Sequence, residues 1–437
     1  MLTPSLPILI LALAPHAAAD SETAVLELEQ GDRVCLLGNA LAERMQHDGW
    51  LETLLQVRLP DRELTFRNLG FSGDELSVHQ RMVNFGKLPD DKLGLNLPKD
   101  RFLVWDRFLA HCSADVLFAF FGFNESFAGE AGLERYRADL ESFVDHIAAQ
   151  RYNGSDAPDL VLFSSIPFED LHDASLPDGN EHNRRLRLYN AVTAAVAAER
   201  GVRFVDLYGP MNARYAASEE PLTINGMHLT AHGNEALAEV ITEHIAPAAP
   251  ASRNAPREAQ VRPAVIAKNL LWFNHYRATD GYNVYGGRSR ERYPRGNSLP
   301  EVPRLTNYEV MQQEMVVLDA MADRDDRLIW SAAAGGAPRG DEVVVPPVTE
   351  VQTNKPGPGP GGAHAFIDGD EARKLMTMAP HMRVDLFADE SRFPELVNPV
   401  QMAWDTRDRL WVAAWPTYPH WQPDLPMNDK LLILEDT

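Results

Sequence analysis

Residues 115–122, "DVLFAFFG", form an unbroken apolar run between an aspartate and a glycine. A strand that faced water on one side would alternate apolar and polar residues, so this run predicts a strand that is buried on both faces. Strands of this kind are typical of parallel sheets that helices cover on both sides. The stretch therefore favours the α/β class.

The neighbouring segments repeat this pattern. Further strands are predicted at residues 34–38, 64–70, 159–167 and 203–208, and amphipathic helices within residues 41–55, 132–151, 181–200 and 234–245. Alternating strands and helices indicate a three-layer α/β/α sandwich with a parallel, flavodoxin-like sheet over residues 32–248. In such sheets functional sites lie at the carboxyl ends of the strands.

Composition limits the possible partners. The formal net charge is -22 at pH 7, which opposes binding to a phosphate backbone, so no nucleic-acid partner is expected. With 437 residues, of which 45% are hydrophobic, the chain is long enough for two or three domains with buried cores.

The N-terminus has the pattern of an export signal. Residues 1–19 combine a short apolar run with Ala17, Ala18 and Ala19 before Asp20, which resembles a signal-peptidase site. The run is too short to span a bilayer. A secreted or periplasmic protein without a transmembrane segment after signal removal is therefore expected.

Only two cysteines are present, Cys35 and Cys112. Both fall in or beside predicted buried strands, so two buried free thiols are expected, although export would permit a bridge. No haem-attachment or four-ligand zinc spacing occurs, so no cofactor or metal site is predicted from the cysteines.

The second half of the chain divides into four segments. Residues 249–263 are predicted to be a connector, 264–332 an appended aromatic and helical subdomain with a helix at 308–324, and 338–365 a Pro/Gly linker. Short strands are expected at 382–387, 400–404, 410–414 and 431–434 within a final unit at 380–437.

Four sequence blocks fall at the predicted strand ends. They are "LLGNALAE" at 36–43, "NLGFSGDE" at 68–75, "FFGFNES" at 120–126 and "NGMHLTAHG" at 225–233. In order and spacing they resemble the blocks of the SGNH, or GDSL-like, hydrolases over roughly residues 32–245. The resemblance implies that the Gly73 amide and the Asn124 side chain stabilise an oxyanion, and that His228 is the catalytic base.

The first block departs from the family pattern at its most important position. Where the pattern G-D-S-[LI] has serine, this chain has Ala40, and a methyl group cannot form an acyl-enzyme. Asn225 replaces the aspartate that would orient His228, and a neutral amide does not stabilise an imidazolium charge. The ordinary Ser-His-Asp mechanism is therefore excluded.

Three explanations remain open. The site binds an ester or an acylated carbohydrate without cleaving it, with Asn39, Asp74 and Glu125 as further ligand-binding residues. Alternatively, His228 activates water directly, helped by Asp74 or Glu125. In the third, Ser72 serves as a displaced nucleophile.

Two further clusters have weaker signals. His228 and His232 have the spacing of helical metal ligands, but the sequence between them suggests a loop that enters a helix, so no metal site is predicted. The segment 274–288 contains His275, Tyr276, Arg277, Asp280, Tyr282, Tyr285 and Arg288. It fits a sugar or anion site and a packed aromatic patch equally well.

The C-terminal stretch 395–419 resembles the first blade of a β-propeller. The resemblance is to large secreted proteins that join a GDSL-like module to a dehydrogenase-type propeller and a haem-binding module. It implies that this chain is an N-terminal fragment whose missing domains are its partners. Besides an enzyme and a ligand-binding module, a third class of function is a docking module within such a haem protein.

Overall fold

The computed structural model describes residues 26–79, 102–247, 253–277, 288–290, 305–348, 366–417 and 421–436. The predicted signal segment 1–19 lies outside these ranges. The first sheet contains β1 (Arg33–Gly38), β2 (Thr65–Asn68), β3 (Val116–Phe120), β4 (Asp159–Phe163) and β5 (Arg203–Val205). Its helices are α1 (Ala40–Asp48), α2 (Trp50–Arg58), α3 (Leu103–Cys112), α4 (Leu133–Ala148), α5 (Asn180–Arg200), α6 (Tyr208–Ala217) and α7 (Ala231–Ile245).

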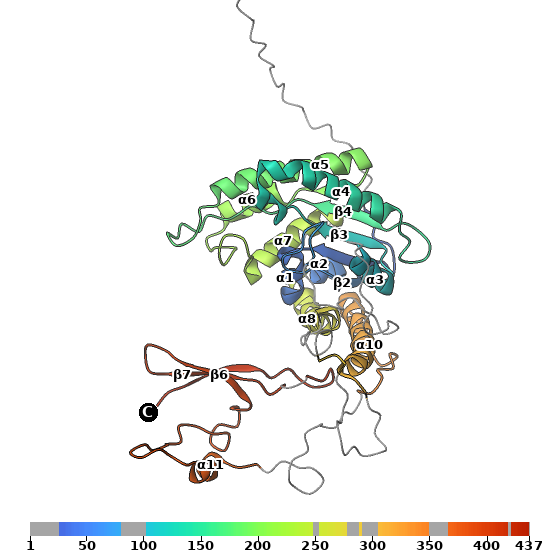
Figure 1. Cartoon of the computed structure of the whole chain (residues 1–437). Coiled ribbons are helices and arrows are strands. Elements are labelled where there is room, and N and C mark those ends of the chain that lie inside the picture. The colour runs from blue at the N-terminus through green and yellow to red at the C-terminus, as the bar shows by residue number, and fades with distance from the viewer. Residues whose placement is uncertain are drawn as a thin grey trace, which may run out of the picture.

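The predicted parallel sheet is confirmed. Its five strands pair in the order β2-β1-β3-β4-β5, and each neighbouring pair is parallel. This is the flavodoxin-like order, in which the strand sequence reverses beside β1 and opens a crevice at the carboxyl ends of the strands. Figure 1 shows the sheet between two layers of helices.

A separate hydrophobic core fills each side of the sheet. Along β1, Val34 and Leu36 pack into the core beneath α1, α2 and α7, whereas Cys35 and Leu37 pack into the core beneath α3, α4 and α5. The same alternation continues along β3. Because both faces are covered, every residue of β3 is buried, as the unbroken apolar run predicts.

The helix predicted within residues 41–55 is interrupted. Gly49 has φ +66° and separates α1 from α2. A Cβ on Gly49 would lie 3.0 Å from Val265 Cγ1, so the glycine permits both the left-handed turn and the close approach of another helix.

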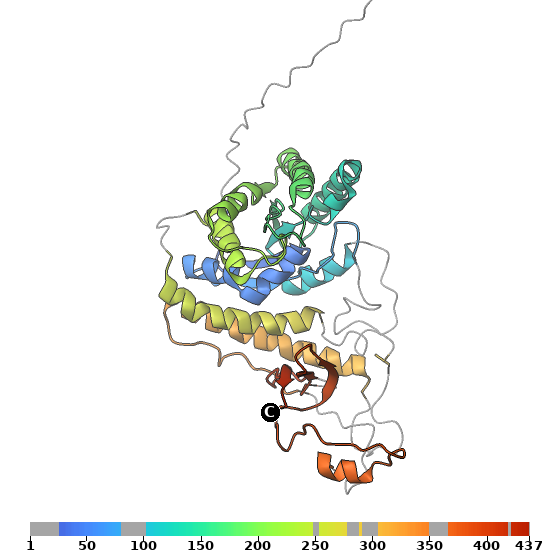
Figure 2. The same ribbon diagram turned by 90° about the vertical axis from the view of Figure 1, so that its left-hand side faces the viewer.

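The predicted connector at 249–263 is wrong in its second half. α8 (Ala255–Arg277) begins inside it and includes Pro263. Packing of Val261 and Val265 against Ile329 offsets the backbone hydrogen bond that proline removes. The predicted helix at 308–324 is part of the longer α10 (Asn307–Ala334). Figure 2 shows α8 and α10 side by side as a hairpin along the α/β sandwich.

This hairpin covers the edge of the sheet. Three alternate backbone carbonyls of the β2 segment point away from β1, and each accepts a hydrogen bond from a hairpin side chain. Leu64 O accepts from Trp330 Nε1 at 2.8 Å, Phe66 O from Lys268 Nζ at 3.0 Å and Asn68 O from Trp272 Nε1 at 2.8 Å. The hairpin therefore satisfies an edge that would otherwise be open to pairing with another strand.

The C-terminal part forms its own antiparallel sheet of β6 (Pro399–Trp404), β7 (Leu410–Ala414) and β8 (Lys430–Leu434), preceded by α11 (Gly369–Leu375). The strand predicted at 382–387 is absent, and Met382 and Phe387 are exposed. An extended segment without a pairing partner does not become a strand. The propeller identity of this unit remains a prediction, and residues 349–365 of the predicted linker lie outside the described ranges.

Cys35 and Cys112 are both buried and free, as expected. Among the helices that the structure describes, none has the length and apolar character needed to cross a membrane.

Candidate active site

The carboxyl ends of the strands border a pocket of about 280 Å³. Five of the predicted site residues line it together: Asn39, Ala40, Gly73, Asn124 and His228. Four separate loops thus converge at one place. The rest of the lining is largely aromatic and aliphatic, with Phe120, Phe121, Phe123, Phe127 and Ile166 among its members.

The first block makes a tight turn from β1 into α1. Gly38 has φ +144°, and a Cβ there would lie 2.4 Å from the carbonyl oxygen of Phe120, so only glycine fits. Asn39 is the N-cap of α1, and its Oδ1 accepts a hydrogen bond from the Leu41 amide at 3.2 Å. Ala40 is therefore the first residue of the helix, and the positive end of its dipole lies beside the pocket.

His228 stands on a short turn between Thr223 and Leu229, which form an isolated β-bridge. The buried carboxylate of Glu169 builds this turn by accepting hydrogen bonds from the backbone amides of Leu222 and Thr223, at 3.1 and 2.7 Å. The Thr223 hydroxyl also donates to Glu169. Glu169 is thus a positioning residue that sequence reasoning missed, since nothing in its local sequence signals the role.

Asn225, predicted to replace the orienting acid, contacts His228. Its Oδ1 accepts from the backbone amides of Met227 and His228 and lies 3.1 Å from His228 Nδ1. Because the backbone donors fix Oδ1 toward the ring, Nδ1 carries the proton and Nε2 is left as the acceptor. Asn225 itself does not line the pocket.

His228 is held in its neutral form. Burial lowers its pKa, and the positive charge of Arg44 lowers it further. Arg44 lies one helical turn after Ala40 and lines the pocket. Sequence reasoning missed Arg44, although the i, i+4 spacing from Ala40 places both residues on one helix face.

The second and third blocks contact each other directly. The Asn124 Nδ2 group donates to the carbonyl oxygen of Asp74 at 3.3 Å. Gly73, with φ +89°, lines the pocket beside this contact. The two predicted oxyanion donors therefore lie on loops that support each other.

Asp74 and Glu125, predicted to bind the ligand, do not line the pocket. Asp74 is 1% exposed. The Glu125 carboxylate accepts from the Leu76 amide at 3.0 Å and from the Gly122 amide at 2.9 Å, so it joins the loops that follow β2 and β3. Burial raises the pKa of Glu125 to about 7. Because these backbone amides need acceptors, the Glu125 carboxylate turns away from the pocket.

Ser72 also lines the pocket, and its amide donates to Glu43. Glu43 in turn pairs with Arg277 at 2.9 Å, and the Arg277 guanidinium lies over the Phe71 ring at 3.6 Å. Burial would raise the pKa of Glu43, but its hydrogen bond with Ser72 and the charge of Arg277 outweigh burial and lower it. Arg277 therefore fastens the end of α8 to the loop that carries Gly73.

The first part of the segment 274–288 is packed, whereas Arg288 is exposed. His275 and Tyr276 are buried, and Arg277 is paired with Glu43. Asp280, Tyr282 and Tyr285 lie outside the described residues. His232 is 66% exposed inside α7, whereas His228 precedes the Thr230 N-cap of that helix, so these two histidines do not share a helix face.

Two polar atoms beside the pocket have no hydrogen-bond partner within the described residues, Arg44 Nε and Asn234 Oδ1. Asn234 is 3% exposed, and its Nδ2 donates to Asp48 at 2.7 Å. Arg44 and Asn234 therefore add polar side chains to a lining that is otherwise largely apolar.

Comparison with known proteins agrees with the arrangement of the four blocks. Residues 38–236 match the model of the GDSL-like Lipase/Acylhydrolase family, and residues 368–437 match that of a Domain of unknown function (DUF7133). No curated protein sequence matches this chain.

Solved structures with a similar fold have low sequence identity to the chain. An acetylxylan esterase from Geobacillus stearothermophilus is 16% identical, and the match covers 52% of this chain and 99% of the esterase with a TM-score of 0.39. An alpha/beta hydrolase from the metagenome of Lake Arreo is 17% identical, with 50% and 96% covered and a TM-score of 0.37.

A gut microbial diltiazem-metabolizing enzyme is 16% identical, with a TM-score of 0.39, and the match covers 51% of this chain and 48% of that enzyme.

The family match is the finding that classifies the sandwich. Residues 38–236 are a GDSL-like lipase/acylhydrolase domain.

Proposed function

We propose that residues 32–248 bind an ester-bearing ligand, such as an acylated carbohydrate, in an esterase pocket that lacks its nucleophile. The observation that carries the proposal is the position of Ala40. It lines the same pocket as Gly73, Asn124 and His228, at the place where the family pattern has serine. An acyl-enzyme cannot form on its methyl group.

The pocket lining supports a ligand with both an apolar and a polar part. Aromatic side chains such as Phe123 and Phe127 suit an acyl group or the face of a sugar ring. Arg44 and Asn234 line the same pocket and supply the polar side chains that hydroxyl or carbonyl groups need. The export pattern at residues 1–19 adds the proposal that this binding takes place outside the cytoplasm.

A second candidate is slow hydrolysis by a water molecule that His228 activates. Water would attack the acyl carbon while its proton passes to Nε2, and the tetrahedral intermediate would then break its bond to the alkoxide, which takes the proton from Nε2 and leaves as the alcohol. The tautomer that Asn225 fixes favours this step, because it leaves Nε2 free to accept the proton. The neutral Asn225 and the nearby Arg44 oppose the imidazolium that forms, so binding is the better-supported function.

The test measures hydrolysis of p-nitrophenyl acetate by the full chain and by an Ala40→Ser/Asn225→Asp variant. Binding without cleavage predicts an inert natural chain and activity in the double variant that a further His228→Ala substitution abolishes. Turnover by the natural chain that His228→Ala removes would instead establish the water mechanism.

Ser72→Ala is the control for a displaced nucleophile, since Ser72 lines the same pocket. The binding proposal predicts that Ser72→Ala leaves the activity of the double variant in place. If the double variant is inert although it is folded, the pocket is not an emptied esterase site and the proposal fails.

A further inference from the structure

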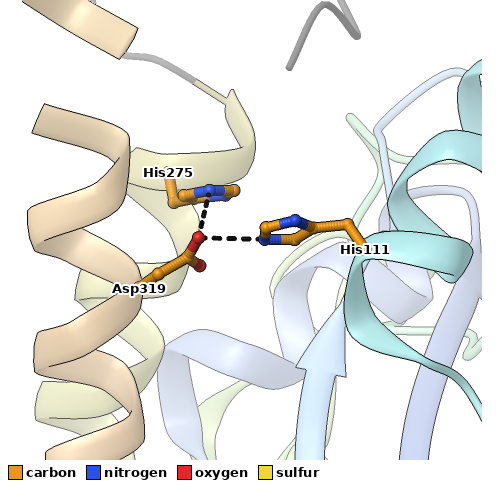
Figure 3. A group of neighbouring side chains, drawn as sticks. All are labelled: His111, His275 and Asp319. Carbon is orange, nitrogen blue, oxygen red and sulfur yellow. Dashed lines mark hydrogen bonds and ion pairs between the residues drawn. The ribbon is translucent and has the colours of Figure 1, made fainter. Parts of the chain in front are cut away.

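Three chemically competent side chains meet where the hairpin packs against the α/β sandwich. His111 lies near the end of α3, His275 near the end of α8 and Asp319 in the middle of α10 (Figure 3). Asp319 Oδ2 lies 2.9 Å from His111 Nε2 and 3.2 Å from His275 Nε2. One ligand atom from each residue falls within 4.8 Å of the other two.

These distances suit a common metal ion. Zinc forms bonds of about 2.1 Å to imidazole nitrogen and carboxylate oxygen, and tetrahedral angles then place the ligand atoms about 3.4 Å apart. The two contacts of Asp319, at 2.9 and 3.2 Å, are near that spacing, and the two imidazole nitrogens lie within 4.8 Å of each other. Figure 3 shows both imidazole rings beside the same carboxylate.

Packing holds the two rings in place. The His111 and His275 rings are stacked, with centroids 5.3 Å apart and an interplanar angle of 14°. The His275 ring also stacks on Trp272, with centroids 4.8 Å apart and an interplanar angle of 14°. A preformed pair of imidazoles loses little conformational entropy on binding an ion.

His275 provides a second, independent observation. Its side chain is 0% exposed, and neither ring nitrogen makes a hydrogen bond within the described residues. The 3.2 Å contact between Nε2 and Asp319 is close enough for an ion pair but lacks hydrogen-bond geometry. A buried imidazole left in this way costs free energy unless another partner satisfies it.

We propose that His111, His275 and Asp319 bind a divalent transition-metal ion of the zinc class, which joins α3 to the α8–α10 hairpin. Two imidazoles and one carboxylate form a ligand set that suits zinc better than it suits magnesium or calcium. The His111 and Asp319 side chains are each 28% exposed, so the remaining coordination position is open to water. None of the three residues lines the pocket beside Ala40. The proposed role of the ion is therefore to hold the hairpin in place.

The ionisation of the ligands is compatible with this role. Burial would raise the pKa of Asp319, but the two imidazoles outweigh it and hold the pKa below its usual range, so the carboxylate stays charged.

The test titrates Zn²⁺ into the chelator-stripped full chain by isothermal calorimetry at pH 7.5. One ion per chain is expected, and His111→Gln and Asp319→Asn should each weaken binding at least tenfold. His172→Gln is the matched control, because His172 is 87% exposed and also lies beside a carboxylate, 3.2 Å from Asp170. It should leave the affinity unchanged.

Two further measurements keep the result interpretable. Co²⁺ in place of Zn²⁺ should give the visible absorption of a site with nitrogen and oxygen ligands in the natural chain and not in His111→Gln. Thermal unfolding in EDTA shows whether the variants fold like the natural chain. Zinc binding that is equally tight in the natural chain and in a folded His111→Gln, or an equal loss in His172→Gln, overturns the proposal.

Discussion

At the scale of single residues, the pocket depends on a few positions where only one residue type fits. Gly38 is the clearest, because its backbone conformation and the nearby Phe120 carbonyl both exclude a Cβ. We expect Gly38→Ala to lower the free energy of unfolding by about 3 kcal/mol or more. Gly31→Ala is the control, since Gly31 has φ +86° but no atom within 4 Å of its ideal Cβ, and it should cost only about 1 kcal/mol. Urea denaturation measures both, and equal losses would contradict the steric argument.

Glu125 gives a prediction about pH. Its pKa is about 7 in the folded protein against an ordinary value of 4.5, so the folded state holds the proton more tightly than the unfolded state. The resulting stabilisation is complete below pH 4.5 and is lost as the pH rises through 7. From pH 4.5 to 7.5 the natural chain should therefore lose about 1–3 kcal/mol of stability relative to Glu125→Gln. Denaturation curves of both proteins at the two pH values test this, and parallel pH dependences would refute it.

The predicted site residues show what the sequence reveals at this scale. Ala40, Gly73 and Asn124 each follow a strand, and parallel strands bring their carboxyl ends together, whereas His228 reaches the same pocket from the turn before α7. Asp74 and Glu125 lie in the same blocks, yet neither lines the pocket, and Glu125 accepts from backbone amides instead. Which way a loop side chain points depends on neighbours that are distant in sequence, so the pattern does not reveal it.

At the scale of elements, the attachment of α8 depends on a buried ion pair. Lys268 Nζ lies 2.7 Å from Glu52 Oε2, and the two side chains are 0% and 6% exposed. Burial raises the pKa of Glu52 to about 7, although the charge of Lys268 opposes the shift. The pair joins α8 to α2 inside the protein, where neither charge has access to water.

Lys268→Met should therefore destabilise the protein by about 3–5 kcal/mol, because it leaves Glu52 buried without its partner. Lys268→Met/Glu52→Leu should recover a large part of this loss, since an apolar pair of similar volume has no charge to desolvate. Chemical denaturation of the natural chain, both single variants and the double variant forms a complete cycle. Additive losses would show that the pair is not coupled.

The elements that the sequence predicts well are those whose local pattern and tertiary setting agree. The strands are confirmed within a few residues because continuous apolar runs and burial on both faces coincide. The break at Gly49 and the start of α8 before Pro263 were not predicted, since both depend on contacts between the hairpin and the sandwich. α3 was also missed, although Trp105, Phe108, Leu109 and Cys112 have helical spacing.

At the scale of the whole molecule, the hairpin is part of the folded unit that contains the pocket. It satisfies the carbonyls of the β2 edge, and Arg67 on β2 pairs with Asp323 and Asp326 of α10 at 2.9 and 2.8 Å. Arg277 extends this attachment to the loop that carries Gly73. The antiparallel sheet, in contrast, pairs only within itself among the described strands.

Two truncations separate these roles. A chain that ends at residue 348 keeps the hairpin and loses the C-terminal sheet. We expect its free energy of unfolding to change by less than about 1 kcal/mol, so its main thermal transition should stay within about 2 °C of that of the full chain.

A chain that ends at residue 247 exposes the β2 edge and leaves Glu52 and Arg67 without their partners. It should unfold at least 10 °C lower and form oligomers on size-exclusion chromatography, because an open strand edge pairs with other chains. A monomeric 1–247 chain with the melting temperature of the 1–348 chain would show that the α/β sandwich needs no hairpin.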